Sequence, residues 1–339
     1  MSISISYNGI INNEFPFPFL QNFADFINNQ PLKKFILFYD QKGNSIPAIL
    51  SKSSFLKVLQ FQFSPIDKYS KQLSINDENL FLDELVSFIT REKLCDKIIQ
   101  GANHALFKTF PKKSIHVPFG SYKMNLKNSL EELFNNLHGK NRNVIKNAQR
   151  KGIKILYGRK VLIDFYFLYE KTTKRSNMYC EEINYFKKLY DCLGANIVCS
   201  VCYHGNEPLG GLFMIYTNYC GFYLYGASSD KTTINGAINY LQWEMISLLK
   251  SKGVKMYDFV GARLSDVEGT RLGGIQKFKQ RFGSRLEKGY LWKIEINRTK
   301  CFLHKILLKI KLKLKGVPFP TDIIDQEIKA FKQKPIQMK

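Results

Sequence analysis

Histidine is scarce in this sequence: there are five in 339 residues, and none stands in an HExxH or similar metal-binding frame. The seven cysteines lack zinc-type spacing. Cys199 and Cys202 lie in an apolar alternating run, where a strand would put residues three apart on opposite faces. No Ser-His-Asp or Cys-His arrangement is readable. We therefore expect no bound metal or cofactor, no covalent acyl-enzyme and, from the odd cysteine count, reduced thiols.

Long hydrophobic runs are also missing. The longest uncharged run, residues 209–229, is interrupted by a polar turn at 217–221, so two strands explain it better than a membrane span. Residues 1–13 are polar and lack the charged and apolar regions of a signal peptide. The sequence therefore predicts a cytoplasmic protein.

Acidic residues are in short supply as well. They number 28 against 51 Lys and Arg, which gives a formal net charge of +23 and a pI near 9.6. This balance favours anionic partners such as RNA, acidic lipid headgroups or phosphorylated precursors. One helical segment concentrates basic side chains without an acidic residue between 140 and 160: Lys140, Arg142, Lys146, Arg150 and Lys151. A solvated helix face and a polyanion site are both open interpretations of it.

The elements that are present predict an α/β (α+β) protein. Residues 1–125 form a module without a catalytic motif, in which a hairpin at 35–50 and a helix at 78–91 are the clearest elements. Residues 150–297 then run helix, helix, three antiparallel strands, helix, strand, helix, strand. The helices are expected at 162–174, 183–192, 236–252 and 271–282, and the strands at 197–203, 209–216, 222–225, 254–260 and 290–296.

This element order resembles the GNAT acyltransferase fold, in which the donor lies where two strands part beside a helix start. At residue level the chain resembles the FemAB family. The resemblance rests on the basic helix with Arg142 and Arg150, the strand end at 257–259, and above all Gly274-Ile-Gln-Lys-Phe-Lys-Gln-Arg-Phe-Gly283. It implies two tandem GNAT-like domains, at 1–125 and 126–298, and transfer of an aminoacyl group from aminoacyl-tRNA to a cell-wall precursor. Motifs support it over residues 115–297, and element order alone over 15–115.

Two features depart from the GNAT pattern. The loop before the central helix, Lys231 to Gly236, has Ile234 where acetyl-CoA-dependent enzymes have a glycine, and a side chain there narrows the approach to a pyrophosphate. This argues against acetyl-CoA. The long helical arm of some FemAB members is missing, since no extended heptad stretch interrupts 160–297. Asn235 and Gly236, at the helix start, remain candidates for binding an anionic group.

The resemblance suggests which residues would carry acyl transfer to an amine. Lys279 would stabilise the developing oxyanion, with a surface lysine as the alternative, and Asp258 would accept the amine proton, with a capping role as the alternative. Tyr223 and Tyr225, expected on one face of their strand, would line the acceptor channel. The other candidate substrate-binding residues are Arg263 and Arg271, for a precursor phosphate, and Phe278, Phe282 and Gly283 of the signature.

The tail at 299–339 contains a basic amphipathic helix at 301–315. Leu303, Leu307, Ile310 and Leu314 fall on one face and lysines on another. A membrane surface, RNA or the protein's own core could cover this helix. The predicted function is N-acyl transfer to an amine of a peptidoglycan or polysaccharide precursor. The alternatives are an acyl-CoA- or acyl-carrier-dependent GNAT enzyme and a non-catalytic polyanion binder on a degenerate GNAT fold.

Overall fold

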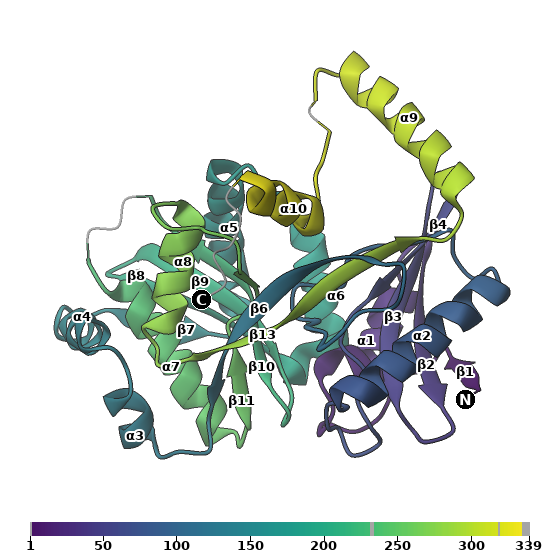
Figure 1. The fold of residues 1–339 in the computed structure, drawn as a ribbon. Helices are drawn as coiled ribbons and strands as arrows, with labels where there is room; N and C mark the ends of the chain where they lie inside the picture. Colours follow the sequence, from purple (N-terminus) through teal and green to yellow (C-terminus); the bar gives the residue numbers. More distant parts are fainter. Residues whose placement is uncertain (1, 231–233, 318, 334–339) are drawn as a thin grey trace.

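A computed structural model describes residues 2–230, 234–317 and 319–333. One mixed sheet runs through the described chain in the order β1-β2-β3-β4-β5-β13-β6-β11-β10-β9-β8-β7, and β12 pairs with β6 beside this path (Figure 1). The α/β class is confirmed. The strands are β1 Ile3–Ser6, β2 Lys33–Asp40, β3 Ser45–Ser53, β4 Leu56–Phe61, β5 Lys97–Ile98, β6 Ile115–Asn125, β7 Lys154–Tyr157, β8 Ile197–His204, β9 Glu207–Tyr216, β10 Gly221–Ser228, β11 Met256–Asp258, β12 Ala262–Arg263 and β13 Arg285–Glu295.

Helices cover both faces of this sheet. All the elements expected for 150–297 are present in the expected sequence, but two short strands that were not expected, β7 and β12, are added to them. The helices are α1 Gln21–Asn28, α2 Ile75–Arg91, α3 Leu130–Asn135, α4 Gly139–Arg150, α5 Leu162–Arg175, α6 Ile183–Leu193, α7 Ala237–Ser251, α8 Arg271–Gln280, α9 Arg298–Leu314 and α10 Ile323–Gln333. The sequence signals act locally. Ser129 and Glu132 form the expected capping box of α3, and Ser74 caps α2 by accepting from the Asp77 amide.

The long strands β6 and β13 join the two halves of the sheet. They pair antiparallel from Ile115 opposite Lys293 to Lys123 opposite Arg285. At its far end β13 also pairs with β5, through Ile294 opposite Ile98. The predicted boundary at 125–126 falls where β6 ends, yet β5 and β6, which precede it, both pair with β13, which follows it. The division into domains at 125 and 298 stays a prediction.

Alternation along β8 separates two buried clusters. Cys199 packs on one face with α5, α6 and α1, and Cys202 packs on the other with α4 and α7, so the expectation that they face opposite ways is confirmed. The first cluster includes residues of both halves: Phe17 lies edge-on to Phe222, with 5.3 Å between the ring centroids. This shared core fixes the N-terminal half against the face of β10 and β11.

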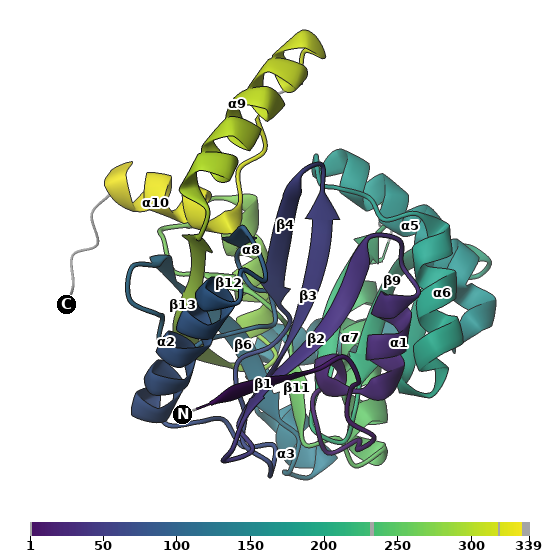
Figure 2. The same cartoon turned by 90° about the vertical axis from the view of Figure 1, so that its right-hand side faces the viewer.

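Two differences from the expected elements concern the C-terminal half. The strand expected at 254–260 is only Met256–Asp258, because Val260 and Gly261 take φ values of 53° and 72° that no strand allows. The tail contains a second helix, α10, which the sequence analysis did not predict. Helix α10 packs on the sheet, whereas α9 projects from the body (Figures 1 and 2). Among the described helices, none is long and apolar enough to cross a membrane.

Candidate active site

The two strands β10 and β11 part after a very short parallel pairing. Only Gly221 with Tyr257 and Phe222 with Asp258 are in register. Beyond them β10 continues to Ser228, while the chain after Asp258 turns away and β12 pairs with β6 instead. Asp258 therefore lies at the point of divergence. The left-handed backbone of the β-branched Val260 is unusual, and such conformations concentrate at functional sites.

Asp258 is buried, with 1% of its surface exposed. Its carboxylate accepts hydrogen bonds from the Ser121 hydroxyl and from the Val260 amide, the latter at 2.7 Å. Burial raises the pKa of Asp258, against the opposing effects of Lys123, the Ser121 and Val260 hydrogen bonds, and Lys279. Burial and a raised pKa make this carboxylate a better proton acceptor than an exposed one, and the two donors fix its position.

Lys279 reaches the same turn from α8. Its side chain is buried, and its Nζ donates to the carbonyls of Val260 and Gly261, the latter at 2.7 Å. Burial lowers the pKa of Lys279 to about 8, and the nearby Asp258 opposes that shift. The structure thus brings together the two residues predicted to be catalytic and excludes the surface-lysine alternative.

The signature aromatics hold this end of α8 in place. Phe282 is fully buried, and its ring centroid lies 5.1 Å from that of Phe278 and 5.5 Å from that of Phe259. Gly283 follows with φ 73°, and a Cβ there would lie 2.7 Å from the Asn136 carbonyl oxygen. Glycine is therefore required for the chain to pass α3 into β13.

The sequence analysis missed a third charged residue, Lys123 of β6. It lies directly opposite Asp258, and its Nζ forms an ion pair with Glu287 of β13 at 2.5 Å. Burial alone would lower the pKa of Lys123, but Asp258 and Glu287 raise it above its usual value. The alternation of β6 carried the signal, because it places Ser121 and Lys123 on the face of the strand opposite Tyr122 and Met124.

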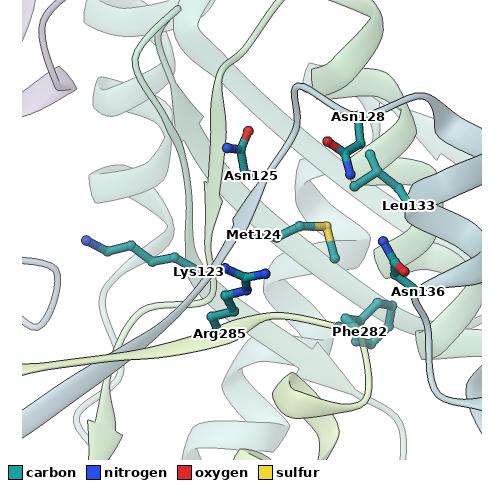
Figure 3. A pocket seen from close by; sticks show the side chains of 9 residues that line it. Lys123, Met124, Asn125, Asn128, Leu133, Asn136, Phe282 and Arg285 are labelled. Atoms are coloured by element: carbon teal, nitrogen blue, oxygen red, sulfur yellow. The ribbon is translucent and has the colours of Figure 1, made fainter.

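A cavity of about 430 Å³ opens beside these residues, between α3 and the paired ends of β6 and β13. Phe282 and Gly283 of the signature line it, whereas Lys279 and Asp258 do not. In Figure 3 the Lys123 side chain points away from those of Asn128 and Asn136. The full lining is Lys123, Met124, Asn125, Asn128, Leu133, Asn136, Phe282, Gly283 and Arg285. Carboxamides and a guanidinium over an aromatic floor suit a polar ligand that carries a carboxylate.

Comparison with known proteins places this chain in a family. The model of the FemAB family matches residues 53–204 and 203–290. The chain belongs to the FemAB family. The resemblance drawn from the signature at 274–283 is confirmed. The Lipid II:glycine glycyltransferase of Staphylococcus haemolyticus is 29% identical over 118 residues, which make up 32% of this chain and 28% of that protein. The alignment with this curated relative thus spans less than a third of its length.

Solved structures share the fold of this FemAB protein. FemX superimposes with a TM-score of 0.61 at 15% identity, over 89% of this chain and 99% of that chain. The C-terminal domain of a putative lysylphosphatidylglycerol synthetase from Agrobacterium fabrum gives 0.51 at 11% identity, over 80% of this chain and 86% of that one. At these identities the likeness concerns the fold alone.

The expectation that Tyr223 and Tyr225 share one face is wrong. A β-bulge shifts the register between them, so Tyr223 packs in the cluster with α7 and Tyr225 in the cluster with α5 and α6. The hydroxyl of Tyr223 lies where a Cβ of Gly226 would be, and that of Tyr225 is 3.3 Å from the Tyr185 hydroxyl. The two tyrosines therefore lie on opposite faces of the sheet and cannot line the same channel.

The start of α7 is tightly packed in this FemAB protein. Gly236 has φ 94°, and a Cβ there would overlap the Val144 carbonyl of α4. Asn235 precedes it, and Ile234 is buried in the core. Lys231, Thr232 and Thr233 of the candidate loop lie outside the described residues. Close contact with α4 narrows the space for an anionic group at this helix start.

Some of the predicted anion-binding side chains already have hydrogen-bond partners within the protein, and others are exposed. The guanidinium of Arg263 is engaged by α10, with Nη1 3.2 Å from Glu327 and Nη2 2.7 Å from Gln326. Arg142 donates to the carbonyls of Asn135 and Leu137 at the end of α3. Exposed positions remain for the others: Arg271, Lys140, Lys146, Arg150 and Lys151. In the described parts of the chain, no group of three His, Cys, Asp or Glu side chains is arranged to hold a metal ion.

Proposed function

We propose that this FemAB protein transfers an aminoacyl group from an activated donor to an amine of a peptidoglycan precursor by direct attack. The observation that carries the proposal is the convergence of Lys279 and Asp258 at the point where β10 and β11 part. The family membership and the relative named as a glycyltransferase support the same reaction class. Polysaccharide precursors with a free amine are the alternative acceptors.

The ammonium of Lys279 has one N–H to offer a substrate. A protonated lysine carries three N–H donors, and the carbonyls of Val260 and Gly261 take two of them. The third would stabilise negative charge on the carbonyl oxygen of the donor ester as the amine attacks. One such donor typically lowers the activation barrier by about 3 kcal/mol.

Asp258 would complete the proton balance. The acceptor nitrogen forms its bond to the donor carbonyl carbon and loses a proton to the Asp258 carboxylate, directly or through water. The ester C–O bond then breaks, and the departing hydroxyl oxygen takes up the proton. The cavity lined by Arg285 and the three asparagines, between α3 and the ends of β6 and β13, would hold a carboxylate of the acceptor peptide.

The donor is proposed to be aminoacyl-tRNA. The exposed basic side chains of α4 and the residue that follows it, Lys140, Lys146, Arg150 and Lys151, would contact its phosphates. Acyl-CoA and acyl-carrier protein are the alternative donors. A non-catalytic polyanion binder would use the same basic face.

The test supplies each donor separately, as charged tRNA, acyl-CoA and acyl-carrier protein, together with a nucleotide-linked precursor that has a free amine. Mass spectrometry of the precursor should show the mass of one aminoacyl residue with charged tRNA only. A precursor whose amine is acetylated serves as the control and should remain unchanged. No product with any donor, combined with salt-sensitive tRNA binding that ignores charging, would favour the polyanion binder.

A further inference from the structure

Helix α9 stands away from the body although much of its surface is apolar (Figures 1 and 2). Its only buried residue among those described is Cys301 at the base. Leu303, Leu307, Ile310 and Leu314 keep 50–83% of their surface exposed. Large apolar side chains that stay exposed together along one helix usually mark a contact surface.

The exposed apolar side chains form one stripe with lysines on both sides. With 3.6 residues per turn, Leu303, Ile306, Leu307, Ile310 and Leu314 fall within one arc of α9. Lys309 and Lys313 flank one edge of that arc, and Lys311 flanks the other. No acidic residue occurs between 298 and 321. Long lysine side chains beside an apolar stripe place their ammonium groups at the level of anionic headgroups.

The chain is anchored at the base of α9 and again at α10, after the linker that follows α9. At its base the Asn297 side chain accepts from the Lys300 amide, and the Lys300 ammonium pairs with Asp96 at 3.1 Å. After the linker, α10 packs on the sheet and is held there by hydrogen bonds and ion pairs. Its buried Glu327 accepts from Arg263 and Ser265, and Lys293 pairs with Asp322 and Asp325 at 2.7 Å each.

We propose that α9 is an interfacial arm that lays its apolar stripe on an anionic lipid surface. The proposal rests on the proposed function, since it supplies the site with an acceptor carried on a lipid. Charge complementarity selects this occupant. A second copy of the same helix would repel it, and RNA phosphates would leave the apolar stripe uncovered.

Flotation of the full chain with vesicles tests the arm. Phosphatidylcholine vesicles with about 30% phosphatidylglycerol should recover at least tenfold more protein than vesicles of phosphatidylcholine alone. The double variant Leu307→Glu/Ile310→Glu should lose this recovery at least tenfold. Because both side chains are exposed, its folding should be unchanged. The matched control is Leu80→Glu/Ile163→Glu, at exposed sites on α2 and α5, and it should float like the wild type.

Transfer assays separate the failure of this proposal from failure of the proposed function. With a nucleotide-linked acceptor the α9 variant should keep the wild-type rate, and with a lipid-linked acceptor in vesicles it should slow at least tenfold. If the α9 variant and the wild type float equally, the proposal that α9 binds lipid is wrong. Binding to RNA but not to vesicles would also contradict it. If no acceptor reacts, the proposed function fails while the flotation result still decides the lipid contact.

Discussion

A buried ionisable side chain holds a loop or turn in each half of the sheet, Glu78 in the N-terminal half and Lys279 in the C-terminal half. The two differ in whether a hydrogen-bonding group is left over for a substrate. Glu78 of α2 is 1% exposed, and its Oε1 accepts from the amides of Lys108 and Thr109 at 2.7 and 3.1 Å. Burial raises the pKa of Glu78 to about 7. Lys279 of α8 likewise holds a turn, through two carbonyls, and burial lowers its pKa to about 8.

The surroundings of Glu78 indicate a structural role, whereas those of Lys279 indicate a chemical one. Glu78 fastens a loop to a helix in the half that has no catalytic motif. Lys279 has a buried carboxylate, Asp258, close by, lies where two strands part, and keeps one N–H beyond those that hold the turn. A shifted pKa alone would have selected both residues. Only Lys279 also has an N–H group left over for a substrate and a buried carboxylate, that of Asp258, nearby.

Removing the ammonium should have the largest effect on the rate. We expect Lys279→Ala to lower kcat about 10²–10³-fold, because a donor aimed at the oxyanion is lost, with little change in donor affinity. Initial rates under donor saturation measure this. Lys279→Arg keeps the charge and serves as the control for folding. A kcat unchanged in Lys279→Ala would show that the lysine only holds its turn, as Glu78 does.

The next effect concerns the proton acceptor. Asp258→Asn keeps the shape and can still accept from Ser121 and Val260, but it cannot take up a proton. We expect kcat to fall about 10²-fold, as is typical when a general base is removed. Circular dichroism should show an unchanged fold. Wild-type turnover in this variant would assign Asp258 to the capping role.

Glu78→Gln should leave the rate within about twofold and change the pH dependence of stability instead. Burial raises the folded pKa of Glu78 above the ordinary glutamate value of 4.5, so the native state binds this proton more tightly than the unfolded chain between about 4.5 and 7. Its contribution to stability is therefore present at low pH and is lost as the pH rises through 7. Melting temperatures at pH 5 and pH 8 should differ less in the variant. An undiminished difference would contradict the account of Glu78.

Much of the C-terminal half could be predicted from local signals. The element order of 150–297, the capping box at Ser129 and the signature around Lys279 all depend on residues close together in the chain. The fold class follows from these alternating elements. The proximity of Lys279 and Asp258 could be suspected through the family resemblance, but their contacts with the turn at 260–261 could not.

What escaped prediction depends on pairings between distant residues. Lys123 joins the site only because β6 lies between β11 and β13, and the bulge that separates Tyr223 from Tyr225 is set by β9. Arg263 carries no local sign that Glu327, 64 residues later, takes its guanidinium. The docking of helix α10 depends on Arg263, Ser265 and Lys293, which are distant from it in the chain.

The pH dependence of kcat/KM tests the central claim, that Lys279 acts as a fixed cation with one free N–H. A neutral amine has only two N–H groups, and the two carbonyls occupy both. The rate should therefore fall, approaching tenfold per pH unit, as the pH rises above about 8, and in Lys279→Arg this limb should move upward. A wild-type kcat/KM that keeps rising from pH 7 to pH 9, after subtraction of uncatalysed ester hydrolysis, would contradict the account.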